Sequence, residues 1–275
     1  MTLWEVLIAG VLGLTAGTIG GLAGIGGSLI MLPGLVLLLG YADQANPDGA
    51  HAEQHLYMAA AMCVNVLVAI PAAMRHHKAG AVRWDLYPWI LGAMAVGMVA
   101  GVLLGNGLEG DTLRLLLAGF IVAYALLNLW RVITNPPEQT DPGKERADHP
   151  RMCFIGGSAG FFGGLLGLGG GVVMVPLLQV MGRIRLREAI ATSLTVMPIT
   201  AAVGATVKVG SLGRHEVLGE PLQRIDVLWL VLAMGPMAVL GGRLGASLNH
   251  ALPLRGVRAI VSVVLLIAAA RMAVL

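Results

Sequence analysis

The sequence predicts an all-α polytopic membrane protein built from two inverted repeats, with about eight to ten membrane-spanning or half-spanning helices. Of its 275 residues, 57% are hydrophobic and only 12% are charged, about half the charged share of a typical soluble domain. No Asp, Glu, Lys or Arg occurs in residues 6–42 or 152–182. These runs lack the polar face that a soluble helix shows at helical period. Membrane insertion follows.

The first apolar run is too long for a single crossing. As one helix, residues 6–42 would measure about 55 Å, whereas a bilayer core is about 30 Å thick. The run must therefore enter the membrane and return, either as two spans or as a re-entrant hairpin of half-helices.

An internal duplication defines the domain organisation. Residues 16–33 (AGTIGGLAGIGGSLIMLP) and 159–176 (AGFFGGLLGLGGGVVMVP) are identical at ten of eighteen positions. Such self-similarity indicates a duplicated structural unit. A polar stretch rich in Pro, Asp and Gly separates the copies, which is typical of a solvated linker. We predict a first membrane repeat at 1–134, a cytoplasmic linker at 135–151 and a second membrane repeat at 152–275.

The charges of the loops predict the orientation. Basic residues gather at 75–83, 131–151, 183–187 and 255–258, whereas 41–55 carries acidic residues and no Lys or Arg. Because basic loops stay in the cytoplasm, all four basic stretches lie inside only if each glycine-rich segment enters and returns. The halves are then inverted, and both termini lie outside.

The duplicated glycine runs are the candidate binding site. Irregular backbone at membrane depth persists only where protein or a wet cavity covers it. A half-helix that starts just after each run would direct free N–H groups and its positive dipole end at an anion. Close helix packing through small residues is the alternative. The candidate ligands are Gly24, Gly26, Gly27 and Ser28 in the first run, and Gly167, Gly169, Gly170 and Gly171 in the second.

Polar residues on the spans that follow the runs could complete the site. Thr192, Ser193 and Thr195 lie within one turn of the span after the second run, and Asn65 occupies the position that matches Thr195. They would donate hydrogen bonds to an oxyanion or cap backbone carbonyl groups.

Other polar residues have plainer interpretations. Lys78 and Lys208 occupy matching positions near span ends, and snorkelling anchors are the favoured interpretation. His76 and His77 are expected in a solvated basic loop. No Asp or Glu lies deep in a span, which argues against a carboxylate-driven cation pump.

Enzymatic function is a weak alternative. Residues 156–160 match G-x-S-x-G around Ser158, but a nucleophile elbow needs a strand-to-helix turn. We therefore expect no enzyme, no catalytic residue, no metal and no cofactor. The loop arginines form no basic face, so nucleic acid is not an expected partner. A passive anion channel and an intramembrane serine hydrolase stay open as alternatives.

The motifs at 21–33 and 164–178, the stretch HHKAGAVRWDL at 76–86, and Ala-Thr-Ser at 191–193 resemble the duplicated motif of the TauE/SafE sulfite exporter family. The resemblance covers most of the chain. It implies a secondary transporter of the bacterial inner membrane that exports sulfite, sulfoacetate, thiosulfate or a related organosulfonate, coupled to the proton gradient. Alternating access between the halves is the expected mechanism.

Two departures from the family pattern predict unequal halves. Ser28 stands where the second copy has Gly171, and Met62-Cys63 replaces Thr-Ser in the first half. The expected partners are the sulfur-containing anion and the lipid bilayer; a homodimer is left open.

Overall fold

The computed structural model describes residues 3–38, 47–134, 148–214, 216–217, 220–221 and 223–248, with three short helical pieces at 262–263, 265–267 and 269–270. The α-helices in these ranges are α1 (Leu3–Ala23), α2 (Ser28–Leu38), α3 (Pro47–Lys78), α4 (Tyr87–Asn106), α5 (Gly110–Thr134), α6 (His149–Leu165), α7 (Gly171–Val180), α8 (Leu186–Ser211) and α9 (Arg224–Leu248). A 3₁₀ turn, Leu212–Arg214, precedes two short antiparallel strands, β1 (Glu216–Val217) and β2 (Glu220–Pro221).

The helices confirm the predicted all-α polytopic fold. In the described part of the chain, six helical segments are long and apolar enough to cross a bilayer: α1, residues 54–78 of α3, α4, α5, α8 and α9. By contrast, α2 and α7 have only 11 and 10 residues, about half of what a full crossing needs. Large apolar side chains point outward, including Trp4, Val96 and Ile133, each at least 70% exposed. A soluble protein does not present such a surface.

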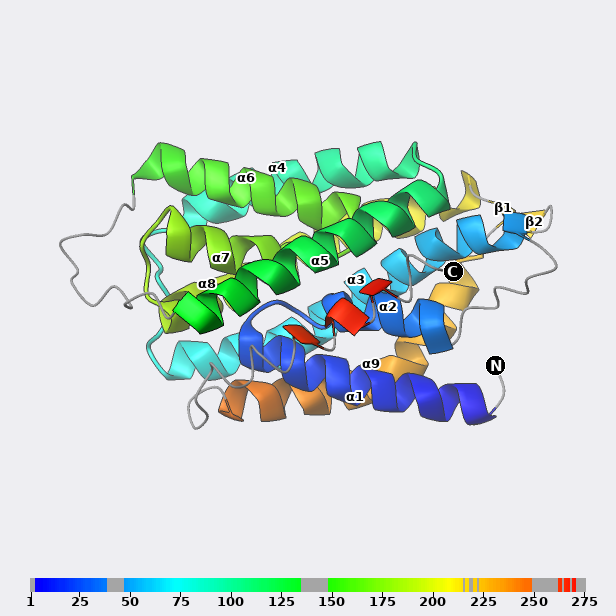
Figure 1. Cartoon of the computed structure of the whole chain (residues 1–275), viewed down its shortest axis with the longest axis horizontal. Helices are drawn as coiled ribbons and strands as arrows, with labels where there is room; N and C mark the ends of the chain where they lie inside the picture. Colours follow the sequence, from blue (N-terminus) through cyan, green and yellow to red (C-terminus); the bar gives the residue numbers. More distant parts are fainter. Residues whose placement is uncertain are drawn as a thin grey trace.

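Helices of the two halves interleave (Figure 1). The most extensive contacts join α1 to α9, α4 to α6 and α3 to α8. In Figure 1, α1 starts at the side of the molecule marked N, whereas α6 starts at the opposite side. Likewise, α3 and α8 run in opposite directions. The first helix of each half therefore packs on a late helix of the other half.

Glycines allow these helices to touch backbone to backbone. A Cβ atom on Gly13, Gly17 or Gly21 of α1 would lie 2.5, 2.3 or 2.5 Å from a carbonyl oxygen of α9. The corresponding glycines of α6 face α4 in the same way. A Cβ atom on Gly156, Gly160 or Gly164 would lie 2.6, 2.1 or 2.3 Å from a carbonyl oxygen of α4.

This packing also explains the G-x-S-x-G motif. Gly156 and Gly160 lie within the uninterrupted helix α6 and contact the backbone of α4. Ser158 is half-buried in the same helix. A nucleophile elbow needs a strand-to-helix turn, and α6 has none.

Candidate functional site

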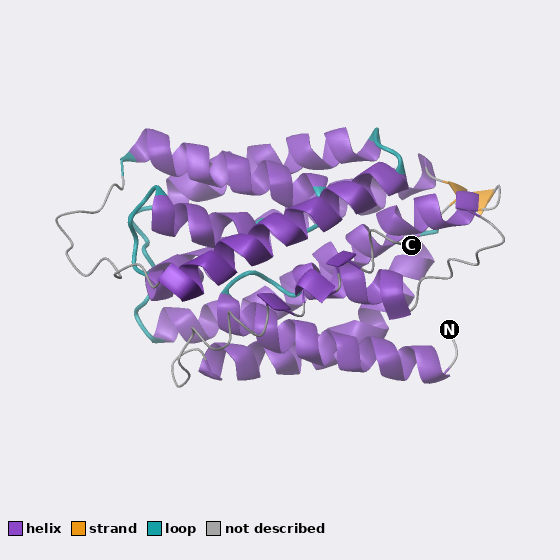
Figure 2. Ribbon diagram, in the orientation of Figure 1, coloured by secondary structure: helices purple, strands orange, loops and turns teal. Residues whose placement is uncertain are grey.

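Each half contains a glycine break between a long helix and a short one. The helix α1 ends at Ala23 and α2 begins at Ser28, while α6 ends at Leu165 and α7 begins at Gly171. Both breaks lie inside the molecule, and Figure 2 shows the first as a loop running among the helices. The predicted breaks are confirmed.

Left-handed backbone makes glycine necessary at these breaks. Gly24 and Gly26 have φ values of 74° and 73°, and their repeat partners Gly167 and Gly169 have 73° and 68°. Only glycine adopts this region without a steric cost. The same local geometry therefore arises twice from the duplicated sequence.

The two breaks touch each other at the centre of the protein. The Ser28 hydroxyl donates to the Leu168 carbonyl oxygen at 2.9 Å, and the Ser193 hydroxyl donates to the Gly24 carbonyl oxygen at 3.1 Å. Ser28 and Ser193 are fully buried. Segments about 140 residues apart in the sequence thus form one site.

Asn65 of α3 connects both breaks. Its Oδ1 atom accepts hydrogen bonds from the backbone N–H groups of Gly27 at 2.9 Å and Ser28 at 3.2 Å, which caps α2. Its Nδ2 atom is buried and has no hydrogen-bond partner among the described residues. A Cβ atom on Gly169 would lie 2.9 Å from this Nδ2. The amide group therefore faces the second break with an unused donor.

The start of α7 lacks an equivalent cap. Thr195, at the position that matches Asn65, instead donates to the Ala191 carbonyl oxygen of its own helix at 2.8 Å. Within the described residues, the backbone N–H groups of Gly170 and Gly171 make no hydrogen bond. The expectation of free amides at both breaks is therefore wrong at α2 and holds at α7.

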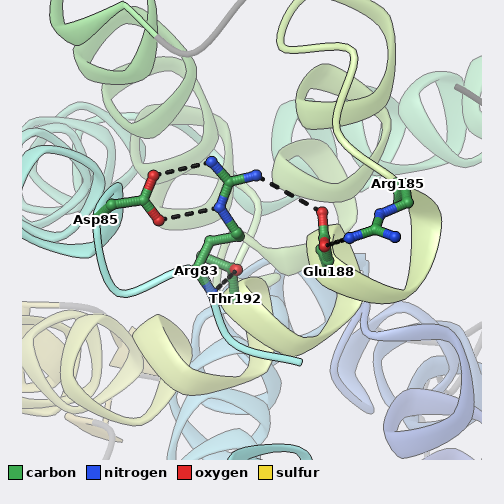
Figure 3. A network of polar contacts seen from close by, with 5 residues as sticks. All are labelled: Arg83, Asp85, Arg185, Glu188 and Thr192. Carbon is green, nitrogen blue, oxygen red and sulfur yellow. Dashed lines mark hydrogen bonds and ion pairs between the residues drawn. The ribbon is translucent and has the colours of Figure 1, made fainter. Parts of the chain in front are cut away.

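Thr192 points toward a different part of the protein (Figure 3). Its Oγ1 accepts from the backbone N–H of Arg83 at 3.2 Å, which ties residues 79–86 to α8. The Arg83 side chain pairs with Asp85 at 2.8 Å and approaches Glu188 at 3.7 Å, and Glu188 also pairs with Arg185. The hydrogen bond from Arg83 holds the pKa of Asp85 below its usual value. Thr192 thus belongs to this network, and its role as an anion ligand stays a prediction.

Methionine side chains, which the sequence analysis did not single out, cover both breaks. The Cε atom of Met197 would lie 2.3 Å from a Cβ atom on Gly26, and Met94 Cε would lie 2.2 Å from one on Gly170. Methionine is flexible and fills irregular gaps. These side chains fill the space over the breaks and could move to admit a ligand. Methionine is common in apolar spans, so its sequence pattern gave no signal.

The lysine prediction is half right. Lys78 is exposed at the end of α3, as a snorkelling anchor should be. Lys208 is fully buried, and its Nζ lies 2.6 Å from His55 Nδ1 and 2.8 Å from Asn106 Oδ1. His76 is also buried, not solvated as predicted, whereas His77 is exposed.

A cavity of about 290 Å³ opens where α3 and α9 end. Its lining includes three basic side chains, from Arg75, Lys78 and Arg243. Basic groups around a cavity raise the local concentration of anions. The cavity lies at the face of the molecule where α8 begins (Figure 1).

Comparison with known proteins gives a consistent family assignment. Residues 9–272 match the family model described as "Sulfite exporter TauE/SafE". MamO of Magnetospirillum gryphiswaldense, described as a probable membrane transporter protein, is 28% identical over 285 residues, covering 93% of this chain and 43% of MamO. YunE of Bacillus subtilis, with the same description, is 32% identical over 109 residues, covering 39% of this chain and 35% of YunE. The chain thus spans about two fifths of the length of MamO. No solved structure matches it.

Proposed function

Because the chain belongs to the TauE/SafE sulfite exporter family, we propose that it is a secondary transporter that exports a small sulfur-containing anion and binds it where the two glycine breaks meet. The chain is a multi-pass membrane protein of a transporter family. Sulfite, sulfoacetate, thiosulfate and related organosulfonates are the candidate substrates, and transport is coupled to protons.

The observation that carries this proposal is the start of α7. The free N–H groups of Gly170 and Gly171 and the positive end of the helix dipole lie there, next in sequence to Gly169, which the unpaired Nδ2 of Asn65 faces. Helix N-termini and exposed backbone amides bind sulfate-like groups well. The buried, unpaired Nδ2 is a second donor to the same place, and a buried donor normally has a partner. An oxyanion would satisfy all three groups.

The donors at this site are neutral, which favours a singly charged substrate. The donors of Asn65, Gly170 and Gly171 carry no formal charge. Burial of an anion costs free energy that increases steeply with its charge, and neutral donors offset only part of that cost. Hydrogensulfite, or the singly charged sulfonate group of an organosulfonate, therefore fits better than sulfate or thiosulfate, which carry two charges on one group.

Several features support alternating access between two inverted halves. Repeat-related helices run in opposite directions (Figure 1), and both glycine breaks meet at the interface of the halves. Discontinuous helices that meet at a repeat interface are a common plan for secondary transporters. The Ser28 hydroxyl joins the two breaks and the Ser193 hydroxyl joins the first break to α8, so passage requires these contacts to separate. This closed contact favours a carrier over an open channel.

The distribution of charge supports an orientation. Arg75, Lys78, Arg151 and Arg185 lie at the same face of the molecule, where α3 ends and α6 and α8 begin. Basic residues favour the cytoplasmic side. We therefore place this face, with its basic cavity, toward the cytoplasm, and the start of α1 outside, in the bacterial inner membrane.

Transport by purified protein in liposomes tests the proposal. Counterflow of labelled sulfoacetate, whose sulfonate group carries one charge, should compete with hydrogensulfite and taurine, and less with thiosulfate, sulfate or a carboxylate of similar size. Absence of counterflow for every sulfur-containing anion would refute the proposal. The Ser158→Ala variant should transport normally, whereas a serine hydrolase would lose its activity.

A further inference from the structure

A second buried polar cluster lies near the opposite end of α8 from the basic face. It consists of Lys208 of α8, His55 of α3 and Asn106 of α4. Lys208 follows Thr195 by thirteen residues, which is about 20 Å of helix. The cluster is therefore separate from the glycine breaks. An ionisable residue buried in a membrane span is by default a candidate functional residue.

The hydrogen bonds of the cluster define where its protons lie. His55 Nε2 is 3.2 Å from the Leu108 carbonyl oxygen, which can only accept, so Nε2 carries a proton. In the neutral ring, Nδ1 then accepts from Lys208 at 2.6 Å, and Asn106 Oδ1 accepts a second hydrogen bond at 2.8 Å. These two acceptors use both N–H groups of a neutral lysine amine. The ammonium form has a third N–H, for which the described residues offer no acceptor.

A second donor in the cluster is also unused. Asn106 Nδ2 is buried and has no hydrogen-bond partner in the described part of the chain. It belongs to the same amide group that accepts from Lys208 through Oδ1. Buried donors normally have partners. Two donors, one on Lys208 and one on Asn106, thus lack an acceptor in this cluster when the lysine is protonated.

The surroundings provide no negative charge in the part of the chain that the structure describes. His55 faces Lys208 from α3, Asn106 faces it from α4, and Ser211 of α8 donates to the Lys208 carbonyl oxygen. No described Asp or Glu forms an ion pair with Lys208. A buried charge without a partner costs several kcal/mol. The ammonium form of Lys208 therefore requires an anion from outside this set of residues.

We propose that Lys208 and Asn106 form a second oxyanion site near the non-basic face, at which the anion and a proton bind together. The proposal rests on the proposed function and supplies its proton-coupling residue. The anion accepts from Lys208 Nζ and Asn106 Nδ2, and the proton resides on Lys208. By thermodynamic linkage, each ligand strengthens the binding of the other. When the anion leaves, the proton passes from Nζ to the adjacent Nδ1 of His55 and then to water at this face.

Proton uptake on anion binding tests this inference directly. Sulfoacetate is added to purified wild-type protein in weakly buffered detergent with a pH indicator, between about pH 6 and pH 9. This range includes the ordinary histidine pKa of about 6.5 and lies below the ordinary lysine pKa of about 10.4. We expect uptake of up to one proton for each anion bound at some pH in this range. Lys208→Gln removes the proton acceptor, and Asn106→Asp supplies a permanent counter-charge that keeps Lys208 protonated. Both variants should lose anion-linked proton uptake.

Arg224→Gln is the matched control, because Arg224 is an exposed basic residue at the start of α9 and lies outside the cluster and the basic cavity. This variant should keep the proton uptake of the wild type. The rate of counterflow should vary with pH in the wild type and should not vary with pH in Lys208→Gln. Anion-linked proton uptake that persists in both Lys208→Gln and Asn106→Asp would overturn the inference. The inference would also fail if wild-type protein showed counterflow but no anion-linked proton uptake. Wild type without any counterflow would instead refute the proposed function.

Discussion

The Asn65→Asp substitution is the sharpest test of the site at the glycine breaks. Asp has nearly the shape of Asn, and its two oxygens retain an acceptor for the N–H groups of Gly27 and Ser28. The substitution removes the Nδ2 donor that faces the second break and replaces it with negative charge. It therefore changes what the site presents to an anion while it preserves the cap of α2.

The expected loss of affinity is large. Two unit negative charges about 4 Å apart repel by about 4 kcal/mol at an effective dielectric constant of about 20. Loss of the donor adds about 1 kcal/mol. Since about 1.4 kcal/mol corresponds to a factor of ten, anion affinity should fall by at least about a thousandfold. Two charge-assisted hydrogen bonds at a helix N-terminus offset part of the cost of burying the carboxylate, so folded protein should still be recovered.

Counterflow and binding of labelled sulfoacetate measure the effect, and thermal unfolding in detergent shows whether the variant is folded. Asn128→Asp is the control for burying a carboxylate in a span away from the breaks, because Asn128 is a buried Asn of α5 whose Nδ2 donates to the Tyr124 carbonyl oxygen of its own helix. Loss of that donor should lower the thermal midpoint of this variant. The control should transport normally. Folded Asn65→Asp with an affinity within threefold of the wild type would refute the assignment of this site.

Three further substitutions test separate parts of the structure. Gly169→Ala forces an alanine into left-handed backbone, which costs about 1–2 kcal/mol, and places its Cβ 2.9 Å from Asn65 Nδ2. Counterflow should therefore fall about tenfold. Gly119→Ala, whose Cβ meets open space, should leave counterflow unchanged. Gly160→Leu places its Cβ 2.1 Å from a backbone oxygen of α4, so yield and thermal midpoint should drop, and a normal midpoint would contradict the packing. Asp85→Asn should lower the unfolding free energy at pH 7 by at most about 1 kcal/mol, because the pair is half-exposed. The pKa of Asp85 is lower in the folded protein than its ordinary value. The difference in unfolding free energy between wild type and Asp85→Asn should therefore be fully present above the ordinary carboxyl pKa of about 3.9. It should disappear as the pH falls through the lower pKa that Asp85 has in the folded protein.

The sequence predicted the features that depend on local chemistry. Charge-free runs of known length predict helices that cross or half-cross the bilayer, and α2 and α7 have the half-crossing length that the sequence left open beside two full spans. The breaks follow from glycine, because Gly26 and Gly169 adopt backbone that other residues avoid. The duplication then predicted that the second break would copy the first.

The sequence could not predict which way a side chain points on a helix buried on several sides. Thr192 and Ser193 are neighbours, yet successive residues are about 100° apart around a helix. Ser193 therefore reaches the first break while Thr192 reaches Arg83. The environment of Lys208 depends on His55, 153 residues away, and on how α3 and α4 pack around α8. A position near a span end is compatible with either snorkelling or burial.

The difference between the halves leads to a last prediction. Asn65 caps α2 from α3, whereas Thr195, at the matching place on α8, leaves α7 uncapped. Thr195→Asn should supply the missing acceptor to Gly170 and Gly171, which stabilises the protein by about 0.5–2 kcal/mol and occupies the donors that an anion needs. We expect a higher thermal midpoint together with loss of anion binding, an unusual combination for a loss-of-function substitution. Thr206→Asn, at an exposed threonine of the same helix, is the control. Wild-type transport by Thr195→Asn with a raised midpoint would show that the start of α7 is not where the anion binds.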